Sequence, residues 1–347
     1  MQKQEFLSRW IEIIKRSSAT LVYKQNFVNT VLRAIRNCST RHTYDTAWAR
    51  AVVEEAESRH ISPDVTEIEI SLEATARKMI RYYWDQTVYF DLNQGPNPLK
   101  QPRILRGVKK LIKEYYKTAG QNNPVPFEKA AFSPRLAEKL DVIVNDALEI
   151  VKGEVIPRFL QMGQFTEELV IYVRGQNVIQ LPQAAAAAIA ENSLLLTEAI
   201  YYRWSQLLEQ YNTSPRLNRK VRIIDTADLR DRPLSYFEKY LDLENPDRIC
   251  FYCGQPIADD KLFIDHVIPW TYLCSDDIWN LVYSHKGCRP VKTSQALPEF
   301  SMARLDRRNK ALLDKISTYV ETDMVAGVLQ DAVSSGLARK KWVLCRE

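Results

Sequence analysis

Four residues near the C-terminal end of the chain have the types and spacing of a zinc site. Cys250 and Cys253 are separated by two residues, and so are His285 and Cys288. Zn²⁺ accepts Cys thiolates and His nitrogens, and four such ligands form a closed structural site. A gap of two residues lets a tight turn aim both side chains at one ion. The alternative, an accidental pairing of core thiols, has to produce the same gap twice, so the spacing predicts structural zinc.

A second group of residues that could do chemistry lies between the two pairs. Asp265 and His266 are adjacent, and the β-branched residues Val267 and Ile268 follow them. We expect short strands at 263–264 and 267–268 that form a hairpin. Neighbouring side chains of a strand point to opposite faces, so the acid and the imidazole cannot both face one way without a twist or a loop. They can still flank one reaction centre as metal ligand and base. The alternative is an acid and a histidine that merely lie on the surface of a small domain.

The stretch 250–298 resembles the zinc-knuckle subgroup of the HNH, or ββα-metal, nuclease superfamily. The rest of the chain resembles no family that we can name. The residues that carry the resemblance are Cys250-x2-Cys253, Asp265-His266-x-x-Pro269-Trp270, Trp279-Asn280-Leu281-Val282, His285-Lys286-x-Cys288, Lys292 and Leu297-Pro298.

The resemblance implies a role for each matched polar residue. His266 would be the general base that activates water for attack on a phosphodiester, work that its ordinary pKa suits near neutral pH. Asp265 would bind a catalytic Mg²⁺ or Mn²⁺, because such ions prefer oxygen ligands. Asn280 would orient the His266 ring, and Lys292 would contact phosphate. The Zn²⁺ would be structural and would staple a motif too small to bury its own core.

One position departs from the family pattern. Where the family usually has Asn or His as a second ligand to the catalytic metal, this chain has Arg289. A guanidinium stays protonated and offers no lone pair, so it cannot bind a cation. Three interpretations stay open: a deliberately inactivated variant of an active nuclease, a natural variant in which Arg289 binds phosphate, and a natural pseudonuclease that only binds nucleic acid.

The function that the resemblance implies is metal-dependent DNA endonuclease activity. Double-stranded DNA is the expected substrate, because the family's motif commonly inserts at a groove, and a restriction or anti-phage role is suggested by family analogy alone. One alternative is a nucleic-acid-binding protein whose zinc module no longer cuts, which Arg289 favours. A further alternative is a protein-interaction scaffold with structural zinc, which would show no salt-dependent DNA binding.

Basic residues on both sides of this stretch are candidates for contact with the nucleic-acid backbone. Phosphate contacts set affinity and position without reading sequence. The net charge of +5, from 48 Lys and Arg against 43 Asp and Glu, permits such a partner without requiring one. A solvated linker and tail are the alternative. The candidates are Arg216, Arg219 and Lys220 before the stretch, and Arg304, Arg307 and Arg308 after it.

The elements that must position these residues are mostly helices. The chain has only 10 Gly among 347 residues, and 46% of its residues are hydrophobic, which favours a soluble and helical protein. We therefore predict a mainly α fold with a large helical N-terminal region and a small C-terminal ββα-metal domain stapled by zinc. The expected helical stretches are residues 1–90, 103–118, 134–161 and 182–211.

The same patterns suggest a division of the chain and a compartment. The predicted regions are a helical N-terminal region (1–120), a helical region with a basic linker (121–238), an HNH-like domain (239–300) and a helical tail (301–347). The helical regions would supply target recognition, regulation, or contact with a protein partner or a second copy in a homodimer. The sequence has no uninterrupted apolar run typical of a signal peptide and no apolar stretch of about 18 residues. We therefore expect a cytoplasmic protein with no membrane partner.

Overall fold

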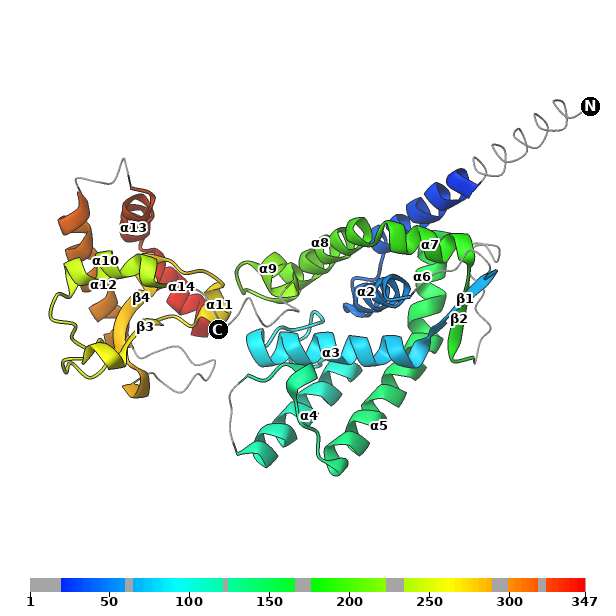
Figure 1. Cartoon of the computed structure of the whole chain (residues 1–347), viewed down its shortest axis with the longest axis horizontal. Coiled ribbons are helices and arrows are strands. Elements are labelled where there is room, and N and C mark those ends of the chain that lie inside the picture. The colour runs from blue at the N-terminus through cyan, green and yellow to red at the C-terminus, as the bar shows by residue number, and fades with distance from the viewer. Residues whose placement is uncertain are drawn as a thin grey trace, which may run out of the picture. The chain divides into compact units, whose positions relative to one another are not determined.

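The structure is a computed structural model that describes residues 20–59, 65–120, 124–165, 176–222, 234–288, 299–317 and 323–346. It divides the chain into two compact units, Met1–Asn212 and Thr213–Glu347. The predicted fold class is confirmed, since helices dominate both units and the described strands form two small two-stranded sheets (Figure 1). The finer division into four regions stays a prediction.

The first unit is a helical assembly with one small sheet (Figure 1). Strand β1 (Glu67–Ser71) pairs antiparallel with β2 (Val178–Pro182), so a strand interrupts the stretch 1–90 that was expected to be helical. A turn of π-helix, Val151–Val155, joins α5 to α6. The helices are α2 (Tyr44–Glu57), α3 (Leu72–Phe90), α4 (Arg103–Ala119), α5 (Pro134–Ile150), α6 (Ile156–Gly163), α7 (Gln183–Glu191) and α8 (Ser193–Tyr211).

Two of these helices show how far local sequence determines the elements. Helix α4 confirms the helix expected over 103–118: it begins after Pro102, buries an apolar stripe that includes Leu105 and Leu111, and ends at Gly120 with φ +65°. The single helix expected over 182–211 is instead two helices, α7 and α8. They meet at Asn192, whose side-chain amide donates to the carbonyl of Ala188 and ends the first helix.

The second unit contains the candidate chemistry. Its strands β3 (Leu262–His266) and β4 (Leu281–His285) pair antiparallel, with His266 opposite Leu281. The hairpin expected between 263–264 and 267–268 is therefore wrong, because the strand that pairs with 262–266 comes from much further along the chain. The helices are α9 (Leu217–Arg222), α10 (Glu238–Glu244), α11 (Trp270–Leu273), α12 (Glu299–Ile316), α13 (Met324–Ser335) and α14 (Leu337–Arg346).

Helix α12 is fastened to the turn that precedes β4 by buried polar side chains. Arg308 donates to the carbonyl oxygens of Ile278 (2.8 Å) and Leu281 (2.6 Å), and Asn309 donates to that of Trp279 (2.9 Å). A buried guanidinium is tolerated only when its donors are satisfied. The helix thus holds the 3₁₀ turn Ile278–Asn280, which lies directly before β4. Among the helices that the structure describes, none is long and apolar enough to cross a membrane.

Candidate functional site

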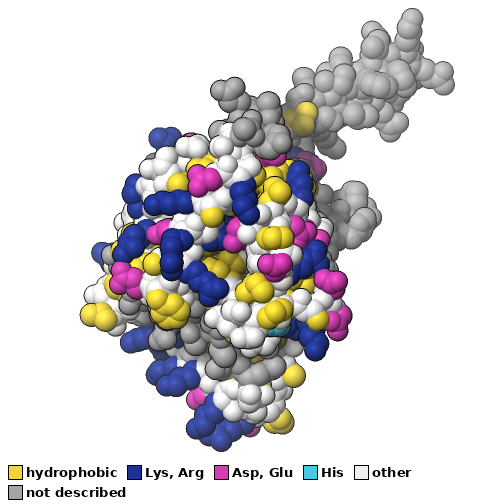
Figure 2. Space-filling model, turned by 90° about the vertical axis from the view of Figure 1, so that its left-hand side faces the viewer, with side chains coloured by type: hydrophobic (Ala, Val, Ile, Leu, Met, Phe, Trp, Pro, Cys, Tyr) yellow, Lys and Arg dark blue, Asp and Glu magenta, His cyan; other side chains and the backbone are white. Residues whose placement is uncertain are grey.

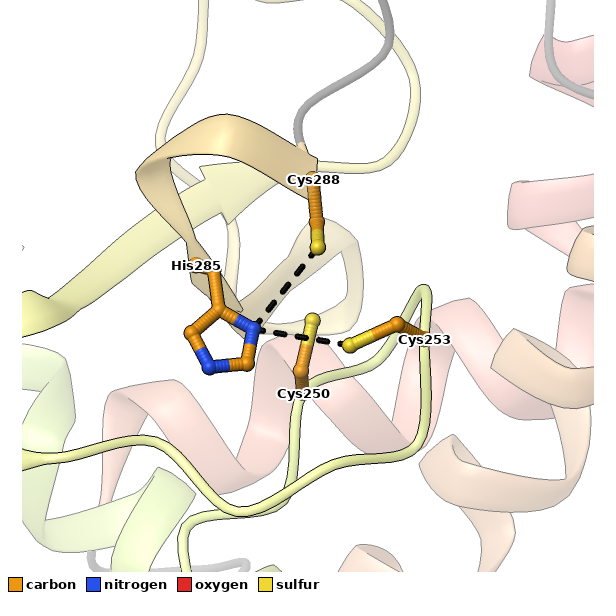
Figure 3. Close-up of side chains that lie close together, drawn as sticks. All are labelled: Cys250, Cys253, His285 and Cys288. Carbon is orange, nitrogen blue, oxygen red and sulfur yellow. Dashed lines mark hydrogen bonds between the residues drawn. The ribbon is translucent and has the colours of Figure 1, made fainter.

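The Cys250/Cys253 pair and the His285/Cys288 pair come together as one four-ligand cluster (Figure 3). The candidate ligand atoms of Cys250, Cys253, His285 and Cys288 all lie within 4.8 Å of one another. Nδ1 of His285 is 3.5 Å from Sγ of Cys253 and 3.7 Å from Sγ of Cys288. Ordinary Zn–S and Zn–N bond lengths in a tetrahedron separate sulfur from nitrogen by about 3.6 Å. The cluster therefore has both the donor set and the dimensions for Zn²⁺.

Backbone hydrogen bonds shape the first of the two knuckles. The amide of Gly254 donates to the carbonyl of Cys250 over 2.9 Å, and Gly254 has φ +71°, which a residue without Cβ adopts at little cost. The amide of Phe251 donates to the carbonyl of Tyr283 in β4 over 2.9 Å. This bond ties the first knuckle to the strand that leads into the second knuckle, a 3₁₀ turn at Lys286–Cys288.

The surroundings of the cluster prepare two of its ligands for a metal. Nε2 of His285 is 3.2 Å from the carbonyl oxygen of Pro256. When Nε2–H donates there, Nδ1 carries the lone pair and faces the sulfur atoms. Burial raises the pKa of the Cys250 thiol, but backbone hydrogen bonds from Cys253, His285 and Tyr252 lower it by more, to about 6. The thiolate, which is the form that binds metal, is therefore favoured at neutral pH.

Asp265 and His266 occupy the end of β3 and bond to different segments, as the alternation of a strand predicts. The Tyr252 hydroxyl donates to Oδ2 of Asp265 over 2.9 Å, and Tyr252 lies between the two cysteines of the first knuckle. Nε2 of His266 lies 2.8 Å from Oδ1 of Asp276. Both predicted residues are largely covered, since Asp265 is 2% exposed and the His266 side chain 6%. The Asp276 side chain is 26% exposed.

Asn280 is fully buried and holds the backbone just after His266. Its Oδ1 accepts from the amide of Ile268 (2.7 Å), its Nδ2 donates to the carbonyl of the same residue (2.9 Å), and its own carbonyl accepts from the amide of Val267 (2.9 Å). Both polar side-chain atoms of Asn280, Oδ1 and Nδ2, thus form hydrogen bonds to the backbone. Its role in orienting the His266 ring stays a prediction, and any such effect would run through the chain from Val267 to Ile268.

A family model described as HNH endonuclease matches residues 250–296. The predicted resemblance of this C-terminal segment to HNH endonucleases is therefore confirmed. The segment contains the four-ligand cluster, the Asp265–His266 pair and Asn280, and the family points to nuclease activity on a nucleic acid. A search of curated proteins and a search of solved structures returned no match to the chain.

Three of the basic residues predicted to contact the nucleic-acid backbone form hydrogen bonds to carbonyl groups at the end of helix α11. The guanidinium groups of Arg216 and Arg219 donate to the carbonyl of Cys274 over 3.2 and 3.0 Å, and Lys220 donates to that of Tyr272 over 2.5 Å. Cations at helix C-termini satisfy the last carbonyl groups. Lys220 is fully buried, so its prediction as a nucleic-acid contact is wrong, whereas Arg216 and Arg219 remain exposed.

The three predicted arginines of α12 have three different environments. The Arg304 guanidinium lies over the Phe251 ring, 5.1 Å from its centroid, beside the first knuckle of the HNH domain. Arg307 is exposed. Arg308 is 7% exposed, and its guanidinium donates hydrogen bonds to backbone carbonyl groups and to Glu244. The prediction that it contacts nucleic acid is therefore wrong. Figure 2 shows Lys and Arg at several places on the face it draws, between acidic and hydrophobic side chains.

The donors around Asp265 determine whether this carboxylate can hold the expected catalytic divalent ion. Within the described ranges, the zinc-type cluster alone gathers three or more candidate metal ligands. Mg²⁺ needs only one or two protein carboxylates, because waters and substrate phosphate complete its shell. The Asp265 carboxylate fits that requirement. Arg289 and Lys292, the other two predicted residues of this site, lie outside the described residues.

Sequence reasoning missed Asp276, the carboxylate that bonds to His266. Its only local signal is a position four residues before Asn280, inside the HNH segment. Sequence distance does not show that a loop ten residues after His266 returns to its ring.

Proposed function

We propose that this chain is a metal-dependent endonuclease that hydrolyses phosphodiester bonds of double-stranded DNA, with His266 as its general base. The observation that carries the proposal is the pairing of the His266 ring with a carboxylate at 2.8 Å inside an HNH segment. The adjacent carboxylate of Asp265 supplies an oxygen ligand for a hard divalent ion.

The orientation of the ring assigns the proton transfer to one nitrogen. Because an ionised carboxylate can only accept a hydrogen bond, Nε2 of His266 is the nitrogen that carries the hydrogen toward Asp276, and the lone pair of the neutral imidazole lies on Nδ1. Nδ1 then takes the proton of the water that attacks phosphorus. A Mg²⁺ or Mn²⁺ held by Asp265 would stabilise the charge that develops on the phosphate and leaving oxygens.

The cysteine cluster would hold a structural Zn²⁺ that also supports the catalytic acid. Tyr252 belongs to the first knuckle and donates to Asp265, so the fold of that knuckle positions a carboxylate of the active site. All six cysteines are free thiols in the structure. We place the protein in the cytoplasm, where the zinc-binding thiols stay reduced.

The proposal makes a demand on access to the site. Asp265 and the His266 side chain are 2% and 6% exposed, so duplex DNA and a divalent ion must displace part of what covers them before the chemistry. Arg216 and Arg219 are exposed basic residues anchored at helix α11, close to the loop that carries Asp276. We propose that these two arginines contact the DNA backbone next to the loop that carries Asp276.

We propose restriction or defence against phage as the setting for this activity, on family analogy alone. One active site cuts one strand, so double-strand breaks would need a homodimer or two successive events. Nicked circles that appear before linear DNA would identify a chain that acts singly.

A second candidate function is binding to nucleic acid without cleavage. Arg289 favours it, because a guanidinium stands where the family supplies a metal ligand. The two functions separate in a plasmid assay with Mg²⁺ or Mn²⁺, with EDTA, and with the Arg289→Asn variant. The nuclease proposal predicts metal-dependent cleavage that the variant raises or restores. Salt-dependent DNA binding with no cleavage by either protein would favour the binding function.

A further inference from the structure

We propose that Asp276 is the positioning residue of His266: its carboxylate fixes the ring in the Nε2–H tautomer and stabilises the imidazolium that forms during cleavage. This inference rests on the proposed function for its catalytic part. The hydrogen bond itself is a property of the fold, and it can be tested without activity.

The first support is the geometry of the pair. The distance of 2.8 Å between Nε2 of His266 and Oδ1 of Asp276 is that of a charge-assisted hydrogen bond. The His266 side chain is nearly covered, whereas the Asp276 side chain is partly exposed. The hydrogen bond to this carboxylate holds the imidazole in one orientation.

The second support is that the loop carrying Asp276 is fastened before and after that residue. Before it, α11 ends at Cys274 with φ +50°, and the Cys274 carbonyl accepts from Arg216 and Arg219. After it, the amide of Asn280 donates to the carbonyl of Asp277 over 2.9 Å.

The turn Ile278–Asn280 is in turn held by α12, through the bonds that Arg308 and Asn309 make to its carbonyl groups. A short loop fixed at both ends positions its side chain with little entropy left to lose. The ring partner of His266 is therefore preorganised by elements on both sides of the loop.

The third support is the separate use of Asn280. Its amide oxygen and nitrogen both bond to the Ile268 backbone, so it positions the chain after His266. Asp276 instead bonds to the ring. The two residues thus divide the work: one sets where His266 lies and the other sets which ring nitrogen carries the proton.

The proton transfer balances without a change at Asp276. The attacking water loses a proton to Nδ1 while its oxygen bonds to phosphorus, and the bond from phosphorus to the leaving oxygen breaks. That leaving oxygen takes a proton from solvent, and the imidazolium later returns its proton to solvent. Nε2 keeps its proton throughout, and Asp276 stays ionised beside the transient positive charge, as a carboxylate does when it orients a general base.

The test compares Asp276→Asn, Asp276→Glu and a control, Asp260→Asn, which removes an exposed carboxylate of the same unit. With Mn²⁺ and supercoiled plasmid, Asp276→Asn should lower kcat by about 10²–10⁴-fold with KM and zinc content unchanged. Asp276→Glu should recover part of the rate, and Asp260→Asn should retain it. In a His266→Ala background, Asp276→Asn should cause no further loss.

A spectroscopic measurement on the full chain decides the same point independently of cleavage. With ¹⁵N-labelled histidine in buffer alkaline enough to keep the rings neutral, His266 should show the Nε2–H tautomer in the wild type and a mixture in Asp276→Asn. The proposal is overturned if the variant keeps the wild-type tautomer or nicks at the wild-type rate. It is also overturned if the loss is one of Mn²⁺ affinity, which would make Asp276 a metal ligand. A wild type that never nicks contradicts the proposed function, while the tautomer still decides on Asp276.

Discussion

At the scale of single residues, the metal cluster was predictable and the catalytic pairing was not. Two identical gaps between metal-binding side chains specify Cys250, Cys253, His285 and Cys288 directly, and the structure gathers these four. The partner of His266 could not be predicted in the same way, because the position of Asp276 four residues before Asn280 does not show that its carboxylate contacts the ring. A hydrogen bond between a strand and a distant loop depends on the tertiary fold.

The Cys253→Ser variant tests whether the cluster binds structural zinc. We expect zinc to fall from one ion per chain toward none and thermal stability to drop, because zinc binding contributes directly to folding. Cleavage should fall as well, since the knuckle supports Asp265 through Tyr252. Metal analysis and thermal unfolding measure the effect, with Cys345→Ser as the matched control. Equal zinc content in both variants would contradict the assignment.

A buried acid in the first unit predicts a specific dependence of stability on pH. Burial raises the pKa of Asp85 to about 6, and an accepted hydrogen bond from the Phe127 amide only partly opposes this. The pKa of Asp85 is higher in the folded protein than in the unfolded chain, so the contribution of its protonated carboxyl group to stability is complete below about pH 4. It is lost as pH rises through 6.

We expect Asp85→Asn to raise the free energy of unfolding by up to about 3 kcal/mol at pH 7.5, with a gain that shrinks toward zero near pH 4. Urea unfolding at the two pH values measures it. A gain of the same size at both values would show that packing, rather than ionisation, is responsible.

At the scale of elements, local patterns predicted helices better than strands. Helix α4 follows its apolar period, but β3 pairs with β4 across a long loop, and β1 pairs with β2 across more than a hundred residues. Periodicity shows that a segment can form a strand without showing its partner. The hairpin expected around Asp265 failed for this reason. Val267 and Ile268 leave the sheet to bond with Asn280.

Helix α12 supplies a prediction that separates two neighbouring arginines. Arg308→Ala should lower the free energy of unfolding by about 3–5 kcal/mol, because it leaves Glu244 without its buried partner and the carbonyl groups of the turn before β4 unsatisfied. Arg307→Ala, on the exposed face, should change it by less than about 0.5 kcal/mol. Denaturant unfolding of the two variants is the measurement, and similar losses would contradict the anchoring role of Arg308.

At the scale of the whole molecule, the HNH segment lies within the second compact unit, Thr213–Glu347, and the first unit is a separate helical body. Composition predicted the mainly α class. It could not predict that Asp265 and His266 are nearly buried, because burial depends on tertiary packing. The net charge of the sequence does not show which cations lie at the surface, since Arg307 is exposed while Lys220 and Arg308 are buried.

We expect exposed cations such as Arg307 to contribute to the affinity of the full chain for DNA. Arg307→Ala should weaken binding to duplexes of different sequence about equally and reduce the slope of log K against log salt by about 0.9, the value for one lost phosphate contact. Lys139→Ala, which removes a cation paired with Glu114 in the first unit, is the control. Fluorescence anisotropy at several salt concentrations gives both slopes, and an unchanged slope for Arg307→Ala would remove this residue from the DNA-contact surface.

The central claim is that the His266 imidazole deprotonates the attacking water. The most direct measurement is the nicking rate of supercoiled plasmid by the zinc-loaded full chain in Mn²⁺, compared with that of His266→Ala at equal zinc content. The account predicts nicking by the wild type and a loss of about 10²–10⁴-fold in the variant. Equal rates for the two proteins, or a wild type that cuts no DNA, would contradict it.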